Sequence, residues 1–245
     1  MKKRLYLSLL AVVLLIAAAL YFLPTALFRF ERGGNYALND SLPAEPYNVL
    51  FLGVDVLDLG LASTPMSYFA NASLKADGSV MITASHNTKE WNGCKICRAD
   101  AVPISGATGI KDIEKIFEDI NEFDPPAGVG EITKGDVSKA YAEHVRSFTK
   151  LSRPLHLALD FANGMGIAES CALEGTGLTW DSLYGEYDGD FPNHDANPLH
   201  RETLKDLQEL IRANPGKYAF GVAYDGDADR AGFLDEKGGV IPMDF

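Results

Sequence analysis

Cysteine is scarce in this sequence, and positive charge is outnumbered by negative charge. The 245 residues include 3 cysteines, which are too few and odd in number for a disulfide framework. The chain has 22 Lys and Arg residues against 34 Asp and Glu residues, a formal net charge of -12. A chain this acidic offers little to neutralise a phosphate backbone, which argues against a nucleic-acid-binding protein. The apolar fraction of 47% is ordinary for a globular protein and excludes wholesale disorder.

A long apolar run occurs near the N-terminus. Residues 5–23 follow a basic stretch at 2–4, and their only polar side chains are Ser8 and the phenols of Tyr6 and Tyr21. Such a run is long enough to span a bilayer as a helix and exceeds the apolar core of a secretory signal. It predicts a membrane segment over residues 1–30 and a membrane-anchored localisation, with the rest of the chain on the outer side. A cleaved signal peptide is the alternative.

The remainder of the chain alternates strand patterns with helix patterns. A polar segment with Gly and Pro, residues 31–47, is predicted to be a linker. Strands are predicted over 49–61, 79–85, 155–160 and 218–224, and helices over 66–76, 110–120, 136–151, 164–173 and 202–214. Alternation with short connections is typical of an α/β protein with a largely parallel sheet. We predict a boundary near residues 152–154, which divides the chain after the linker into domains over 48–151 and 152–245.

Three aspartates alternate with small residues directly after the last predicted strand. Asp225, Asp227 and Asp229 can direct several oxygen ligands at one divalent cation. Mg²⁺ and Ca²⁺ are the cations that prefer oxygen ligands. A solvated acidic turn is the simpler alternative. A calcium loop of the EF-hand type is disfavoured because its sixth position is Arg230 instead of glycine, and because the flanking pattern is a strand. An adjacent arginine suits a phosphate better than a calcium cage.

A second polar group follows the strand predicted over 79–85. Ser85 and His86 lie where this strand gives way to a loop, and Lys95 comes soon after. A serine at a strand end can act as an exposed nucleophile, with His86 or Lys95 handling protons. A polar surface loop is the alternative, and a Ser/His/Asp hydrolase is disfavoured because the Gly-x-Ser-x-Gly pattern is missing around Ser85.

Five segments together carry a resemblance to a known family. They are GVDVLDLGLASTPMSYFA (53–70), MITASHN followed by WNGCKI (81–87 and 91–96), DFANGMG (160–166), FPNHDANPL (191–199) and YDGDADR (224–230). In this order they resemble the α-D-phosphohexomutases, the phosphomannomutase/phosphoglucomutase family, over about residues 53–245. The resemblance implies two incomplete three-layer α/β/α domains. It also implies an isomerase that moves a phosphoryl group within hexose phosphates such as mannose or glucose 1- or 6-phosphate.

The resemblance further implies the role of each candidate residue. Ser85 would carry the phosphoryl group as a phosphoserine, and Asp225, Asp227 and Asp229 would hold Mg²⁺ together with an oxygen at Ser85. His86 and Lys95 would handle protons, and Arg230 would support the phosphorylated serine. Phosphoserine adds about two negative charges that three aspartates would repel, so a cation is required in this arrangement.

The sequence departs from the family pattern at three places. Thr88 replaces the proline that usually follows the asparagine of the serine loop, residues 1–52 match nothing in the family, and the sequence stops at Phe245. We therefore expect this polypeptide alone not to turn over hexose phosphates at a useful rate. Two alternatives are a non-catalytic, membrane-tethered module that retains a metal and phosphate site, and a chimeric gene product joined near residues 53–55. A membrane-anchored cell-wall transferase is a weaker alternative.

Overall fold

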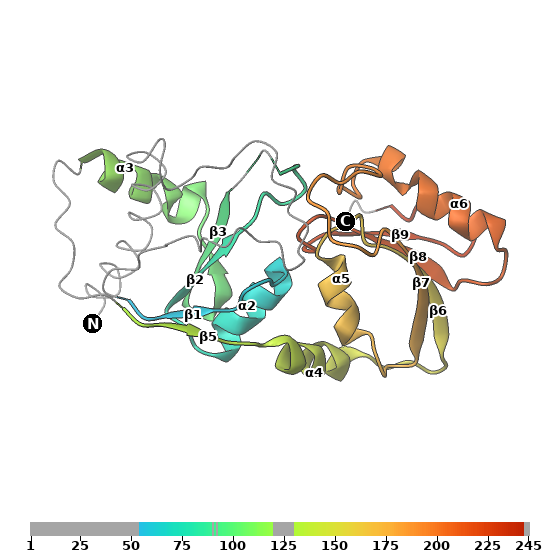
Figure 1. Ribbon diagram of the computed structural model, residues 1–245, viewed down its shortest axis with the longest axis horizontal. Helices are drawn as coiled ribbons and strands as arrows, with labels where there is room; N and C mark the ends of the chain where they lie inside the picture. The colour runs from blue at the N-terminus through green and yellow to red at the C-terminus, as the bar shows by residue number, and fades with distance from the viewer. Residues whose placement is uncertain (1–53, 90, 92, 120–129, 243–245) are drawn as a thin grey trace.

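The computed structural model describes residues 54–89, 91, 93–119 and 130–242, which form two groups of elements (Figure 1). The first group contains β1 (Val56–Asp58), α2 (Thr64–Ser73), β2 (Gly78–Ile82), β3 (Cys94–Arg98), β4 (Val102–Pro103), α3 (Lys111–Asp119), β5 (Ile132–Lys134) and α4 (Ser138–Phe148). The second contains β6 (Leu155–Asp160), α5 (Gly166–Glu169), β7 (Leu178–Leu183), α6 (Lys205–Ala213), β8 (Phe220–Tyr224) and β9 (Ala231–Leu234). The domain division at residues 152–154 stays a prediction, and that position lies in the connection from α4 to β6.

One part of the predicted fold class has to be corrected. No helix among the described residues is long and apolar enough to cross a membrane. The apolar run 5–23, the wider segment 1–30 and the linker 31–47 lie outside those residues. Hydropathy and length are necessary for a membrane span, but they do not by themselves establish a helix. The fold class is therefore given by the α/β domains alone, and the predicted membrane-anchored localisation is withdrawn with the transmembrane helix.

The second group of elements is built on a four-stranded sheet with the strand order β7-β6-β8-β9. Strands β7, β6 and β8 are parallel, and β9 runs antiparallel to β8. The sequence predicted β6 and β8 but not the two edge strands. The last predicted strand was 218–224, whereas the chain turns back after β8 into β9. Edge strands are harder to recognise, because fewer of their side chains are buried and the apolar pattern is weaker.

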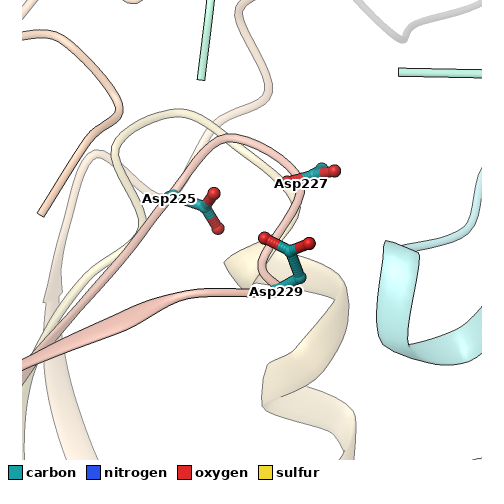
Figure 2. Close-up of side chains that lie close together, drawn as sticks. All are labelled: Asp225, Asp227 and Asp229. Atoms are coloured by element: carbon teal, nitrogen blue, oxygen red, sulfur yellow. The ribbon is translucent and has the colours of Figure 1, made fainter. Parts of the chain in front are cut away.

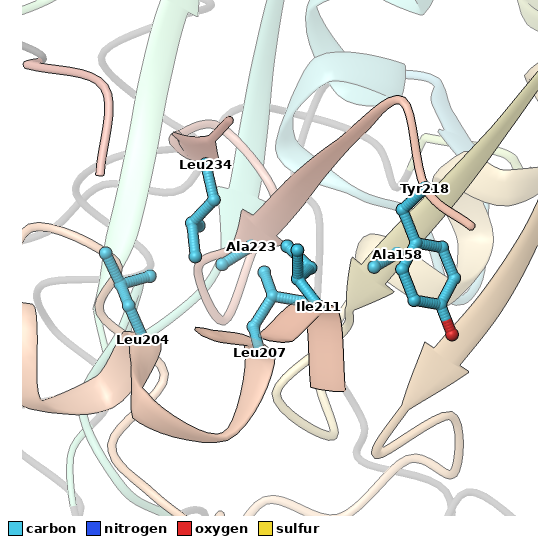
Figure 3. Close-up of a cluster of buried hydrophobic side chains, with 7 residues drawn as sticks. All are labelled: Ala158, Leu204, Leu207, Ile211, Tyr218, Ala223 and Leu234. Carbon is cyan, nitrogen blue, oxygen red and sulfur yellow. The ribbon is translucent and has the colours of Figure 1, made fainter. Parts of the chain in front are cut away.

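Both faces of this sheet are covered. One face packs against α6 through a cluster that Figure 3 shows, made of Ala158, Leu204, Leu207, Ile211, Tyr218, Ala223 and Leu234. The opposite face packs against the α5 side through Leu157, Leu159, Phe161 and Val222. Leu157 and Leu159 lie on one side of β6 and Ala158 on the other, because successive strand residues point to opposite faces. Burial on both faces makes this sheet a firm base for the loops at its carboxyl ends.

The first group has two small sheets in place of one largely parallel sheet. Strands β1 and β5 form a parallel pair, and β2, β3 and β4 form an antiparallel sheet. The strand predicted over 49–61 is represented by β1 alone among the described residues, and residues 49–53 lie outside them. Leu57 of β1 is exposed, so this strand is not buried on both faces. The predicted helices over 66–76, 110–120 and 136–151 correspond to α2, α3 and α4.

Helices from both groups meet in one apolar cluster. Met66 of α2 and Tyr141 and Ala142 of α4 pack with Ala172, which follows α5 in the second group. This contact holds the N-terminus of α2 beside the sheet of the second group. Consequently, the loop after β2 and the loop after β8 are brought to the same boundary.

Candidate active site

The acidic loop, which we define as residues 225–230, is a tight turn between β8 and β9. The N–H of Asp225 donates to the carbonyl of Arg230 at 3.1 Å, and the N–H of Arg230 donates to Asp225 Oδ1 at 3.0 Å. Ala228 adopts a positive φ of 62° to complete the turn. The backbone of the turn is also held by its neighbours, since the N–H of Gly226 donates to Ala196 and that of Met165 donates to Gly226. The loop is therefore fixed from several sides.

The three carboxylates of the acidic loop converge. One oxygen from each of Asp225, Asp227 and Asp229 lies within 4.8 Å of the others. Figure 2 shows Asp225 and Asp229 turned toward each other across the loop. Burial raises the pKa of Asp225 to about 6. Burial also acts to raise the pKa of Asp227, but hydrogen bonds from Lys95 and Thr64 outweigh it and lower that pKa.

The donor set fits a hard divalent cation. Three carboxylates offer the oxygen ligands that Mg²⁺ prefers. Lys95 and Arg230 form ion pairs with these side chains. Their two positive charges do not fully balance the negative charges of three ionised carboxylates. A divalent cation would reverse that negative excess, and oxygen ligands of this kind hold Mg²⁺ better than they hold softer metals.

Ser85 faces the acidic loop across the boundary between the two groups of elements. Its backbone adopts a positive φ of 59°, and its N–H donates to Thr83 Oγ1 at 2.8 Å. Arg230 Nη2 donates to Ser85 Oγ at 3.0 Å, and Ser85 Oγ lies 3.5 Å from Asp227 Oδ1. Ser85 is partly exposed. Its hydroxyl therefore points at the carboxylates and not into a core.

His86 and Arg230 flank the serine hydroxyl. Arg230 Nε donates to Asp225 Oδ2 at 2.8 Å, and its Nη2 lies 2.5 Å from His86 Nδ1. A guanidinium can only donate, so His86 Nδ1 accepts and the imidazole is neutral in this arrangement. Burial and the charge of Arg230 lower the pKa of His86, in agreement with that protonation state. His86 Nδ1 lies 3.5 Å from Ser85 Oγ.

Lys95 is directed at the carboxylates instead of at Ser85. From β3 its Nζ forms ion pairs of 2.5 Å with Asp227 Oδ2 and Asp229 Oδ2. Burial acts to lower the pKa of Lys95, but the hydrogen bonds to both aspartates outweigh it and raise the pKa. Lys95 therefore stays charged at neutral pH, which suits charge stabilisation better than proton transfer.

Two threonines that the sequence analysis did not single out contact the acidic loop. Thr64 Oγ1 and Thr83 Oγ1 both donate to Asp227 Oδ2, at 2.7 Å and 3.1 Å. Thr83 lies two residues before Ser85, and Thr64 is the first residue of α2. Their position in two of the family-like segments was a sequence feature that could have drawn attention to them.

A hollow of about 290 Å³ borders Ser85. It is lined by Asn87, Lys89 and Trp91 of the serine loop, which is the loop after β2 that carries Ser85. Phe191 of the second group also lines it. Lys89 Nζ forms an ion pair with Asp190 at 2.6 Å, which joins the two sides of the hollow. Its volume lies just below the range of about 300–1,000 Å³ for small-molecule sites.

Comparisons with known proteins agree on one family. Residues 49–124 match phosphoglucomutase/phosphomannomutase alpha/beta/alpha domain I, and residues 139–239 match alpha/beta/alpha domain II. Phosphomannomutase of Escherichia coli is 36% identical over 200 residues, covering 77% of this chain and 43% of the relative. Phosphoglucomutase of Neisseria gonorrhoeae is 37% identical over 193 residues, covering 78% of this chain and 41% of the relative.

A solved structure shows the same likeness in three dimensions. A phosphoglucomutase/phosphomannomutase family protein from Burkholderia thailandensis matches with a TM-score of 0.68 and 33% identity, over 77% of this chain and 42% of that one. The chain thus spans less than half the length of the relatives it matches.

Proposed function

This chain belongs to the phosphoglucomutase/phosphomannomutase family, and from that premise we propose that it takes part in phosphohexomutase chemistry through Ser85 and Mg²⁺. The observation that carries the proposal is the contact between Ser85 and the acidic loop. Arg230 Nη2 donates to Ser85 Oγ, and Asp227 Oδ1 lies beside the same oxygen. A phosphoryl group on Ser85 would lie among cations and metal-ligating carboxylates, which is what phosphoryl transfer requires.

We propose that Asp225, Asp227 and Asp229 hold Mg²⁺. When bound, the ion would neutralise charge on the phosphoryl oxygens, a contribution that carboxylates cannot make themselves. Lys95 and Arg230 supply further positive charge beside the carboxylates. The convergence of three carboxylate oxygens supports this assignment.

The proposed transfer breaks the bond between phosphorus and Ser85 Oγ and forms a bond between phosphorus and a hydroxyl oxygen of the sugar. The negative charge that develops on Ser85 Oγ is stabilised by Arg230 Nη2, 3.0 Å away. We propose that the neutral His86 takes the proton of the sugar hydroxyl at Nδ1, which then gives up the hydrogen bond from Arg230 Nη2. The same Nδ1 lies 3.5 Å from Ser85 Oγ, so the proton can pass on to the released serine oxygen. The reverse transfer, from the other phosphate of the bisphosphate to Ser85 Oγ, restores the phosphoserine.

We propose a hexose monophosphate, with glucose or mannose as the sugar, as the substrate. The names of the relatives support this class, since they are a phosphomannomutase and a phosphoglucomutase. Lys89 and Asn87 line the hollow beside Ser85, and we propose that they bind polar groups of such a ligand.

The test is transfer of a phosphoryl group to Ser85. The full chain is incubated with Mg²⁺ and glucose 1,6-bisphosphate, and its intact mass is measured. We expect the wild type to gain the mass of one phosphoryl group and Ser85→Ala to gain none. Ser105→Ala, which removes an exposed hydroxyl of the same domain, is the matched control and should behave as the wild type. A wild type that gains no phosphoryl group, or a Ser85→Ala variant that gains one, would contradict the proposal.

A further inference from the structure

The N-terminus of helix α2 receives the acidic loop of the other domain. The N–H of Thr64, the first residue of α2, donates to the carbonyl of Asp227 at 3.1 Å. Pro65 has no N–H, and Ser63 accepts the next two donors, from Met66 and Ser67. The first N–H groups of a helix have no partner within the helix, so Asp227 satisfies a donor that α2 leaves open. The first turn of α2 contains no acidic residue of its own, and the helix dipole favours a carboxylate at this end.

The two oxygens of the Asp227 carboxylate have different surroundings. Oδ2 accepts from Thr64 Oγ1 at 2.7 Å, from Thr83 Oγ1 at 3.1 Å and from Lys95 Nζ at 2.5 Å. An ionised carboxylate has about four acceptor sites over its two oxygens, so three donors fill Oδ2. Oδ1 is left facing Ser85 Oγ at 3.5 Å. Asp227 therefore has one oxygen anchored by the protein and one directed toward the serine.

Among these donors Thr64 is the one that binds Asp227 at two points. Its hydroxyl binds the Asp227 side chain while its N–H binds the Asp227 main chain. Thr64 is fully buried, whereas Lys95 is a long and partly exposed side chain. The adjacent Ser63 donates to Glu169 of α5, which secures the same helix end to the second domain.

We propose that Thr64 is a positioning residue for Asp227, holding Oδ2 so that Oδ1 is presented to the cation and to Ser85. This inference rests on the proposed function, because it concerns how the chain prepares its metal ligand. Partners that orient a ligating carboxylate typically contribute 10–100-fold to metal affinity. The hydroxyl of Thr64 should therefore affect metal binding without touching the metal.

The test measures Mn²⁺ binding to the full chain by the loss of the free-ion electron paramagnetic resonance signal. Thr64→Val keeps the shape of the side chain and removes the hydroxyl, and we expect its dissociation constant to rise by about 10-fold. Thr64→Ser keeps the hydroxyl and should restore wild-type binding. Thr176→Val is the matched control: Thr176 donates to Leu173 at a turn of the second domain, and binding should be unchanged.

The outcomes separate this inference from the proposed function. If the wild type binds Mn²⁺ and Thr64→Val binds it equally well, the positioning role is wrong and the metal site stands. If Thr64→Ser binds as weakly as Thr64→Val, the hydroxyl is not the cause and the inference is also overturned. A wild type that binds no Mn²⁺ overturns the metal site and the inference together. If circular dichroism shows that Thr64→Val does not fold, Thr64→Ala is measured against the same expectation.

Discussion

Gly226 shows how closely the serine loop and the acidic loop approach each other. A Cβ atom built on Gly226 would lie 2.3 Å from the carbonyl oxygen of Ser85 and 3.1 Å from the ring of Phe191. A Cβ on Gly164 would in turn meet the carbonyl of Gly226 at 2.7 Å. Only a residue without a side chain allows these backbones to pack, so glycine is required here by contact instead of by an unusual φ.

We predict that Gly226→Ala separates the two loops. The new methyl group meets backbone, which cannot rotate away, and overpacking of this kind typically costs about 1–3 kcal/mol. Urea unfolding should show the loss of stability, and phosphoryl transfer to Ser85 should fall in the same variant. Gly106→Ala is the control, because a Cβ there meets nothing within 4 Å. Wild-type stability and phosphorylation in Gly226→Ala would show that the loops are not packed as described.

At the scale of elements, His194 ties the long connection after β7 to the end of β6. Its Nε2 lies 3.0 Å from Oδ2 of the buried Asp160, and its Nδ1 lies 2.8 Å from the carbonyl of Asp195. Both partners are acceptors, so both ring nitrogens carry protons and the imidazole is charged. Burial acts to lower the pKa of His194, but the hydrogen bonds to Asp160 and Asp195 outweigh it and raise the pKa.

This tie predicts a pH dependence of stability. Because the folded pKa of His194 is raised above the unfolded value of about 6.5, its contribution is fully present below that pH and is lost as pH rises through the folded pKa. In His194→Gln we expect the free energy of unfolding to fall by about 1.5–3 kcal/mol at acidic pH and to differ less from the wild type at alkaline pH. Urea titrations at several pH values measure this, with His144→Gln of α4 as the control. A constant difference across the pH range would contradict the charged pair.

At the scale of the whole molecule, Glu169 joins the two domains. Its carboxylate accepts from Ser63 Oγ at the start of α2 and from the hydroxyl of Tyr141 on α4, the latter at 2.6 Å. Ser63 and Tyr141 are buried, and Glu169 itself is partly buried. Burial raises the pKa of Glu169, although both hydrogen bonds act against that shift. The Glu169 side chain of α5 therefore links the start of α2 to α4.

We predict that Glu169→Ala weakens the contact between the domains. Two buried hydroxyls lose their acceptor, and leaving such groups unsatisfied costs about 1–3 kcal/mol each. The midpoint of urea unfolding should fall, and Mn²⁺ should bind more weakly because Thr64 follows Ser63. Glu209→Ala is the control: Glu209 is an exposed residue paired with Lys205, and surface changes of this kind are usually within about 0.5 kcal/mol. A Glu169→Ala variant as stable as the control would show that this tie is dispensable.

The amino-acid sequence by itself determined the features that depend on local pattern. The mostly apolar segment LHLALD (155–160) predicted β6 with the observed bounds, because a strand buried on both faces is rich in apolar residues. The alternating aspartates and the segments around Ser85 predicted a candidate site whose parts the structure brings together, and its chemistry stays a prediction. The sequence failed at β7 and β9, which are edge strands, and at the antiparallel sheet of β2, β3 and β4, whose pairing partners the local pattern does not specify.

Only the tertiary structure decided how these features meet. Arg230 and Ser85 are 145 positions apart, and their hydrogen bond depends on two domains being packed through α2, α4 and α5. The same packing directs Lys95 to Asp227 and Asp229 instead of to Ser85, and it places Thr64 against Asp227. A periodic pattern reports which face of an element is buried, but it carries no information on which distant side chain lies opposite. The identity of the candidate site residues was therefore available in the sequence, whereas their orientation followed from long-range packing.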